Sequence, residues 1–180
     1  TMPSFPWVDH EWLTDVFMYL IYSSLEFHFL LLIFLALYIL SFFVIKKPEQ
    51  DFWSFFVVSS LGTVATLDFL GARPQLLSVL FLAILLVITN KFLENSTRAF
   101  YFLPLLFGLW ANMHAGFFGG LFVLLVIFAL EVFKKFEFEK KKSFSFLQSF
   151  YFKKQPLSKI ITLLGVIMVS FLLTLANPYG

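Results

Sequence analysis

Long apolar runs are the feature that most constrains how this chain can fold. Four stretches are almost wholly apolar, at 27–45, 52–70, 75–89 and 157–176. A helix needs about 20 such residues to cross a hydrocarbon layer of roughly 30 Å. Hydrophobic residues make up 60% of the chain and charged residues 13%, whereas soluble domains are about 45–50% apolar and about 25% charged. The runs therefore predict an all-α, polytopic membrane protein.

The stretch at 100–133 is too long for one span and predicts a broken helical hairpin. Pro104 and the polar cluster of residues 110–116 interrupt its apolar residues. Unwound backbone at membrane depth is tolerated only where protein or a wet cavity covers it. Gly116 and Gly120, four residues apart, would let two helices approach closely. The chain is therefore expected to have about six membrane segments. This stretch contributes two of them, near 100–112 and 116–133.

Basic residues fall almost entirely in the loops of one side of this topology. Only Arg73 lies on the other side. Loops rich in lysine and arginine stay in the cytoplasm, so we expect the lysine-rich loops to be cytoplasmic and to contact lipid headgroups. The basic residues of this side are twelve of the thirteen in the chain: Lys46, Lys47, Lys91, Arg98, Lys134, Lys135, Lys140, Lys141, Lys142, Lys153, Lys154 and Lys159.

The opposite, outer side collects most of the unusual polar residues. Its carboxylates outnumber its single arginine by five to one: Asp9, Glu11, Asp15, Glu26 and Asp68. Further polar residues come from distant parts of the chain: His10, Gln75, Trp110, Asn112, His114 and Asn177. An active site or ligand cleft built from helix ends would require such convergence, although alternate loops of any multi-pass chain share one face.

Each candidate also has a structural interpretation. Glu11 and Asp15 lie four residues apart on one helix face, which suits base catalysis or a divalent metal. The same segment is typical of an amphipathic helix in the membrane interface, and we expect residues 1–26 to form an outer loop with such a helix, before a membrane region at 27–180. His114 beside Asn112 could bind a metal or a substrate hydroxyl, or satisfy backbone groups freed by the broken helix.

The turn between the spans at 52–70 and 75–89 offers two interpretations as well. Asp68 and Arg73 flank it, and they would form either a structural ion pair or a site in which Arg73 binds phosphate. The chain contains no cysteine, which excludes disulfides and thiolate metal sites. No nucleic-acid motif is present, and a chain of this composition is expected to contact membrane lipid.

Four phrases of the sequence resemble, in the same order, those of a family of bacterial multi-pass proteins. They are Pro6 to Asp15, Arg73-Pro74-Gln75, Leu109 to Phe117 and Asn177-Pro178-Tyr179-Gly180. The proteins are GT-C-type glycosyltransferases, similar to the polyprenyl-phosphate mannosyltransferase and RgtA/B/C/D-like groups. The resemblance implies an enzyme of the bacterial cytoplasmic membrane, which moves a sugar from a polyprenyl-phosphate donor to an acceptor on the outer face.

The resemblance also implies roles for the outer residues. Glu11 or Asp15 would be the base, and His10 and His114 would assist it or hold a divalent metal ion. Arg73 would stabilise the phosphate that leaves. Since the family's first span and its acidic segment would precede Thr1, we expect the chain to be incomplete at both ends. The expected substrate-binding residues are Asp68, Arg73, Gln75, Trp110, Asn112, His114 and Asn177.

Two other functions remain open at this point. A broken helix and polar groups in the membrane also suit a transporter or flippase for a lipid-linked or anionic substrate. However, alternating access places its polar groups near the midplane, whereas most of the unusual ones here are predicted on one face. A non-catalytic membrane subunit is the remaining alternative.

Overall fold

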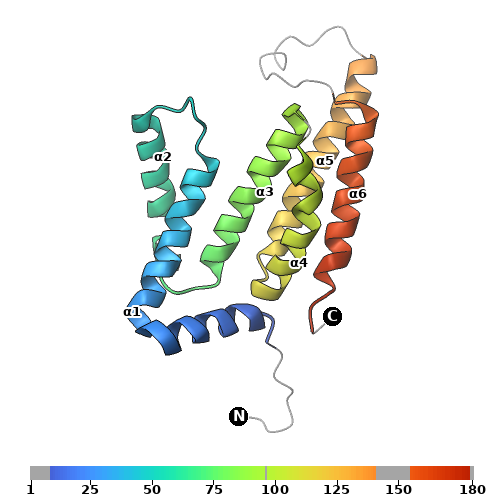
Figure 1. Cartoon of the computed structure of the whole chain (residues 1–180). Coiled ribbons are helices and arrows are strands. Elements are labelled where there is room, and N and C mark those ends of the chain that lie inside the picture. Colours follow the sequence, from blue (N-terminus) through green and yellow to red (C-terminus); the bar gives the residue numbers. More distant parts are fainter. Residues whose placement is uncertain (1–8, 96, 141–154, 179–180) are drawn as a thin grey trace.

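The structure is a computed structural model that describes residues 9–95, 97–140 and 155–178. Every regular element in these residues is a helix. The expected all-α helical bundle of a membrane protein is therefore confirmed (Figure 1). Its elements are α1 (Trp12–Ile45), α2 (Phe52–Ala65), η1 (Leu67–Phe69), α3 (Gln75–Asn95), η2 (Arg98–Phe102), α4 (Leu103–Met113), α5 (Phe117–Lys140) and α6 (Leu157–Thr174).

Four of the described helices are long and apolar enough to cross a membrane, namely Trp12–Ile45, Gln75–Glu94, Phe117–Lys134 and Leu157–Thr174. The other two are shorter. α2 has 14 residues and is followed by η1, and α4 has 11 residues and is preceded by η2. At about 1.5 Å per residue, neither α-helix spans a bilayer alone. The segments expected at 52–70 and 100–112 thus consist of short helices joined to 3-10 turns.

α1 changes direction sharply at Glu26. This residue has φ 67° and ψ 174°, and it is the one non-glycine residue with a positive φ among the described residues. The arm before Glu26 lies across one end of the bundle, while the rest of α1 runs along it (Figure 1). An interfacial helix was expected in residues 1–26, of which 1–8 lie outside the described residues. Its depth in a membrane stays a prediction.

The core lies where α1 packs against α3 and where α4 packs against α6. Phe92 of α3 stacks on Phe100 of η2, with ring centroids 3.9 Å apart, which holds η2 against α3. α2, in contrast, buries none of its residues, so its apolar surface is open to lipid. The largest fully buried apolar side chains are Phe34, Leu76, Leu85, Phe100, Leu103, Phe107, Trp110, Leu124 and Leu163.

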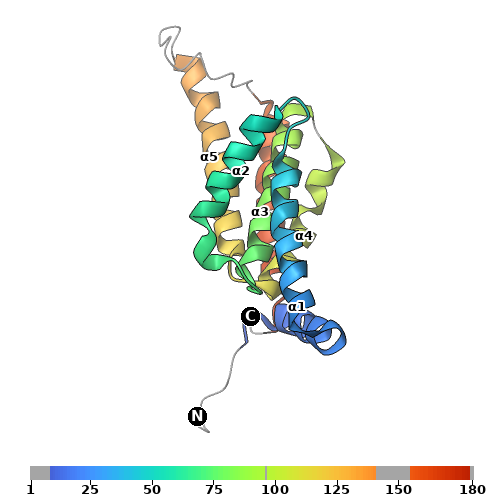
Figure 2. The same cartoon turned by 90° about the vertical axis from the view of Figure 1, so that its left-hand side faces the viewer.

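The expected hairpin breaks at His114. α4 ends at Met113, His114 is extended (φ −165°, ψ 143°), and α5 begins at Phe117. Close approach of the two helices depends on glycine, because a Cβ atom at Gly120 would lie 2.6 Å from Cζ3 of Trp110. After the break at His114, α5 runs back along the bundle, as Figure 2 also shows.

Successive helices alternate in direction, so the connections gather at two ends of the bundle (Figure 1). One end, called the polar end below, holds the start of α1, the turn at 66–74, the turn at 114–116 and the residues that follow α6. The other, called the lysine-rich end, holds the turn at 46–51, the start of η2, the end of α5 and the start of α6. Residues 141–154 lie outside the described residues, and which end faces the cytoplasm stays a prediction.

Candidate functional site

Six side chains from α1, α3, α4 and their flanking turns come together at the polar end. We call them the polar cluster: Glu11, Trp12, Ser78, Trp110, Asn112 and His114. They come from distant parts of the sequence, since the Trp12–Asn112 hydrogen bond joins residues 100 positions apart. Part of the expected convergence is thus a set of direct contacts between side chains, to which Asp68, Arg73 and Gln75 do not belong, and its side of the membrane stays a prediction.

Asn112 anchors the arm of α1 to the bundle. Its Oδ1 accepts a hydrogen bond of 2.8 Å from Nε1 of Trp12. Its Nδ2 donates to the carbonyls of Gly108, at 2.8 Å, and Ala176, at 3.2 Å. Because Asn112 is only 9% exposed, these bonds satisfy an amide that would otherwise be costly to bury.

The carbonyl groups at the end of α4 are capped by distant side chains. The last carbonyls of a helix have no partner within it. Here Asn177 donates to the carbonyl of Ala111 at 2.9 Å, and Thr14 donates to that of Met113 at 2.6 Å. These contacts are a structural role that the sequence left open for the broken helix, and they involve Asn177, Thr14 and the backbone N–H of His114, which donates to the carbonyl of Trp110. The imidazole of His114 has the same kind of role, because it accepts the backbone N–H of Gly116 at the break.

His114 is held in one tautomer by its neighbours. Its Nδ1 accepts the backbone N–H of Gly116 at 2.9 Å and lies 2.6 Å from Oγ of Ser78. Because the N–H of Gly116 points at Nδ1, this nitrogen is an acceptor, so the hydroxyl of Ser78 donates to it while its oxygen accepts the Nε1–H of Trp110 at 2.8 Å. Nδ1 therefore has two donors and carries no proton, which leaves the proton of the neutral ring on Nε2.

The proton on Nε2 faces Glu11. Nε2 of His114 lies 3.5 Å from Oε1 of Glu11, and the two side chains are 15% and 33% exposed. Burial lowers the pKa of His114, and the carboxylate of Glu11 opposes this to a lesser extent. The result is a chain of polar groups from buried Trp110 through Ser78 and His114 to a carboxylate that reaches the surface.

Asp15 and His10 lie beside Glu11, and both are exposed. Asp15 is one turn further along α1, where its backbone N–H donates to the carbonyl of Glu11 at 3.0 Å. Glu11 is thus the carboxylate that contacts His114, while Asp15 stands outside the polar cluster.

Arg73, Asp68 and Gln75 lie at the same end of the bundle and are exposed. Arg73 Nη1 donates to the backbone carbonyl of Asp68 at 3.1 Å. This bond uses the carbonyl and not the carboxylate, so the ion pair that was one interpretation of the turn is not what joins the two residues. The contact leaves most of the guanidinium donors directed elsewhere.

A preformed metal site is not found among the described residues, where no group of three or more His, Cys, Asp and Glu side chains is placed to hold an ion. The surroundings of His114 agree with this. Two donors occupy its Nδ1, and its Nε2 faces Glu11. The polar cluster is a network of polar side chains that ends at the Glu11 carboxylate.

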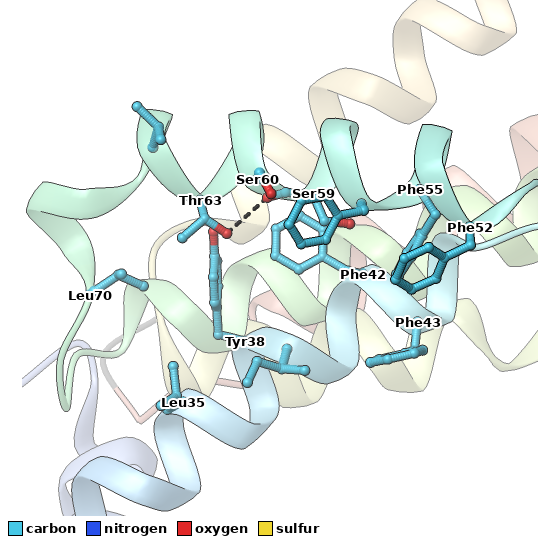
Figure 3. A pocket seen from close by; sticks show the side chains of 13 residues that line it. Leu35, Tyr38, Phe42, Phe43, Phe52, Phe55, Ser59, Ser60, Thr63 and Leu70 are labelled. Carbon is cyan, nitrogen blue, oxygen red and sulfur yellow. Dashed lines mark hydrogen bonds between the residues drawn. The ribbon is translucent and has the colours of Figure 1, made fainter.

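A groove runs between α1 and α2 from the side of the 46–51 turn toward the polar end. Its volume is about 520 Å³, and Figure 3 shows its lining of aromatic and aliphatic side chains with a few hydroxyls. At one extreme it reaches Leu70, three residues before Arg73. The lining residues are Leu35, Tyr38, Ile39, Phe42, Phe43, Phe52, Phe55, Phe56, Ser59, Ser60, Thr63, Val64 and Leu70.

Three residues of the site were missed by sequence reasoning. Ser78 and Trp12 belong to the polar cluster and Thr14 caps α4 beside it, but none of the three was a candidate site residue. Ser78 offered a weak signal as a polar side chain early in an apolar helix. Which polar group it meets depends on how α3 packs against α4.

Comparisons with protein-family models, with curated proteins and with solved structures return no match for this chain. The geometry of the polar end is therefore the basis for a functional assignment, and the resemblance to GT-C-type enzymes stays a prediction.

Proposed function

We propose that this protein is a membrane glycosyltransferase of the bacterial cytoplasmic membrane, which transfers a sugar from a polyprenyl-phosphate donor to an acceptor hydroxyl at the polar end. The observation that carries the proposal is the contact between Glu11 and His114, backed by Ser78 and Trp110. A surface carboxylate oriented by a neutral histidine is the arrangement that a general base needs.

In this proposal Glu11 takes the proton of the acceptor hydroxyl. The oxygen forms a bond to the anomeric carbon of the sugar, and the bond between that carbon and the phosphate oxygen breaks. The polyprenyl phosphate leaves with the electron pair. His114, through Nε2–H, holds the Glu11 carboxylate in place, and Ser78 holds His114.

Arg73 is the group proposed to stabilise the leaving phosphate. It is an exposed cation at the polar end and uses one donor on the Asp68 carbonyl. Phosphate is bound well by the planar guanidinium donors. The α1–α2 groove ends near it at Leu70, which suits a donor whose hydrocarbon chain lies in the groove and whose phosphate reaches Arg73. Gln75 and Asp68, both exposed beside Arg73, would contact the sugar.

Trp110, Asn112 and Asn177 have a different part in the proposal. Each uses a polar atom in a hydrogen bond inside the bundle, and Trp110 is only 1% exposed. We therefore assign them to holding the site together, while His114 and Glu11 face the substrate.

The test is a transfer assay in detergent with a polyprenyl-phosphate sugar. Glu11→Gln removes the base with little change of shape, and we expect kcat to fall about 100-fold or more while KM changes little. Glu49→Gln is the matched control, because Glu49 is an exposed carboxylate in the turn at the other end; it should leave kcat unchanged. Loss of turnover in Asp15→Asn, with Glu11→Gln still active, would move the base to Asp15 and contradict the proposal.

Transport and catalysis give different products in the same preparation. A glycosyltransferase makes a new covalent product in detergent, where no compartments exist. Movement of an unchanged lipid-linked substrate across vesicles, with no product in detergent, would replace the proposal by the transporter alternative.

A further inference from the structure

A second cavity lies at the lysine-rich end, far along α3 and α5 from the polar cluster. Its volume is about 380 Å³. One set of lining residues is apolar: Leu86, Leu93, Ile127 and Leu130. The other set is polar: Thr89, Asn90, Glu94, Glu131, Lys134 and Gln155. A cavity with both polar and apolar walls suits a ligand that has a polar group and an apolar part.

Two buried polar atoms line this cavity without a hydrogen-bond partner in the described structure. Glu131 is 5% exposed; its Oε1 accepts from Lys134, but its Oε2 has no partner. Thr89 is 1% exposed, and its Oγ1 also has none. Burial of an unsatisfied polar group destabilises a structure, and more strongly when the group is charged. These atoms point to a ligand that supplies hydrogen-bond donors.

The charges of the lining indicate a cationic donor. Glu94 and Glu131 oppose Lys134, and Lys134 is already bound to Glu131. The side-chain amide of Asn90 donates to Oε1 of Glu94 at 2.9 Å, so it adds no donor for Glu131. Among the charged side chains of the described lining, negative charge therefore exceeds positive charge. A primary ammonium group balances this charge and brings three N–H donors for the oxygens without a partner.

The surroundings indicate that this ammonium belongs to a lipid. Leu86 and Leu130 line the cavity and are also exposed on the outside of the bundle, at 37% and 50%. Thr89 and Glu131 lie in the last part of two helices that are apolar enough to span a membrane, near the depth of headgroups. Lys134 remains 19% exposed and can face a phosphate.

We propose that the α3–α5 cavity binds the headgroup of an ethanolamine-type phospholipid. The ammonium donates to Glu131 Oε2 and Thr89 Oγ1, the phosphate lies by Lys134, and the acyl chains run along the apolar outer surface. A choline headgroup has the same charge but no N–H donor, so it leaves both atoms unsatisfied. This site is separate from the polar cluster and does not depend on the function proposed for it.

The experiment measures lipid retention by native mass spectrometry. The protein is taken from nanodiscs that contain equal amounts of ethanolamine and choline phospholipids with the same acyl chains. We expect it to retain the ethanolamine lipid about tenfold better, as a charge-assisted hydrogen bond implies. Glu131→Gln should remove this preference, whereas Glu49→Gln, at the same end but outside the cavity, should keep it. Equal retention of the two lipids by the unaltered protein would overturn the proposal.

A second variant covers the case in which Glu131→Gln does not fold. Thr89→Val keeps the shape and the charge of the site and removes only the hydroxyl, so the preference should fall by about threefold. An unchanged preference in Thr89→Val contradicts the proposed contact. Free phosphoethanolamine provides the last arm: if it stabilises the lipid-free protein as strongly as the lipid does, the site binds a soluble amine and the lipid assignment is wrong.

Discussion

The polar cluster and the α3–α5 cavity handle buried polar groups in opposite ways. At the polar end, Asn112, His114 and Ser78 have partners from distant helices for their polar atoms. At the lysine-rich end, Lys159 caps α3 by donating to the carbonyls of Phe92 and Leu93 at 3.0 and 2.9 Å, but Thr89 and Glu131 each keep a buried atom without a partner.

The polar cluster is therefore a preorganised site, whereas the α3–α5 cavity has polar atoms without hydrogen-bond partners. A closed hydrogen-bond network holds its side chains in one geometry before substrate arrives, which favours catalysis. An open network leaves free energy to be gained when a ligand supplies the missing donors. We therefore expect the stability of the polar end to depend on its own side chains. The stability of the lysine-rich end should depend also on the lipid that surrounds it.

The largest effect should come from Gly116→Ala at the polar end. The added Cβ atom would overlap Ser78 Oγ and lie 2.8 Å from His114 Nδ1, so the cluster must separate. We expect a loss of about 3 kcal/mol in the free energy of unfolding, together with loss of transfer activity, measured by thermal unfolding and assay in detergent. Gly119→Ala is the matched control, because nothing lies within 4 Å of its added atom; equal losses in both would show that the close packing does not matter.

An intermediate loss of stability is expected when an asparagine is replaced by alanine at the polar end, and a smaller one at the lysine-rich end. Asn112→Ala removes three hydrogen bonds and leaves Nε1 of Trp12 without its partner, so we expect about 2 kcal/mol of destabilisation. Asn90→Ala removes an exposed bond to Glu94 and should cost within about 0.5 kcal/mol. Unfolding temperatures of the two variants check this, and a greater loss in Asn90→Ala would reverse the assignment of the closed network to the polar end.

The smallest effect is a dependence of stability on pH through His114. Burial holds its pKa below the ordinary value, which is about 6.5. Because the unfolded chain binds the proton more readily, the stabilisation is complete above pH 6.5. It is lost as the pH falls from there through the lower pKa of the folded state.

The corresponding measurement is the unfolding temperature between pH 8 and pH 5. His114→Gln should flatten the decline attributable to this group, whereas His10→Gln, at an exposed position, should retain it. An identical slope in the protein and in His114→Gln would mean that another group titrates.

Sequence reasoning reached some parts of the molecule and not others. The break near residues 112–116 was predictable because Asn112, His114 and Gly116 interrupt an apolar stretch too long for one span, and the structure breaks at His114. Glu11 and His114 were both candidates. Their 3.5 Å contact was not predictable, because it needs the arm of α1 to turn at Glu26 and lie over the end of α4.

The lysine-rich cavity was missed for a related reason. Glu131 follows an apolar run and precedes lysines, so it resembles the ordinary polar edge of a span. Its burial to 5% exposure and its unpaired oxygen follow from how α5 packs near α3. The sequence around Thr89 is typical of any apolar helix. Its hydroxyl is buried without a partner only because of how the neighbouring helices pack.

The sequence by itself determined that this chain forms apolar helices that alternate between a polar end and a lysine-rich end. The reason is local, since a long apolar run in lipid must satisfy its backbone within a helix, and charged residues collect where the runs stop. Only the tertiary structure decided which polar groups meet. The Trp110–Ser78–His114–Glu11 chain and the open cavity at Glu131 depend on helix rotation and separation, because a hydrogen bond forms only within about 3 Å and with suitable direction.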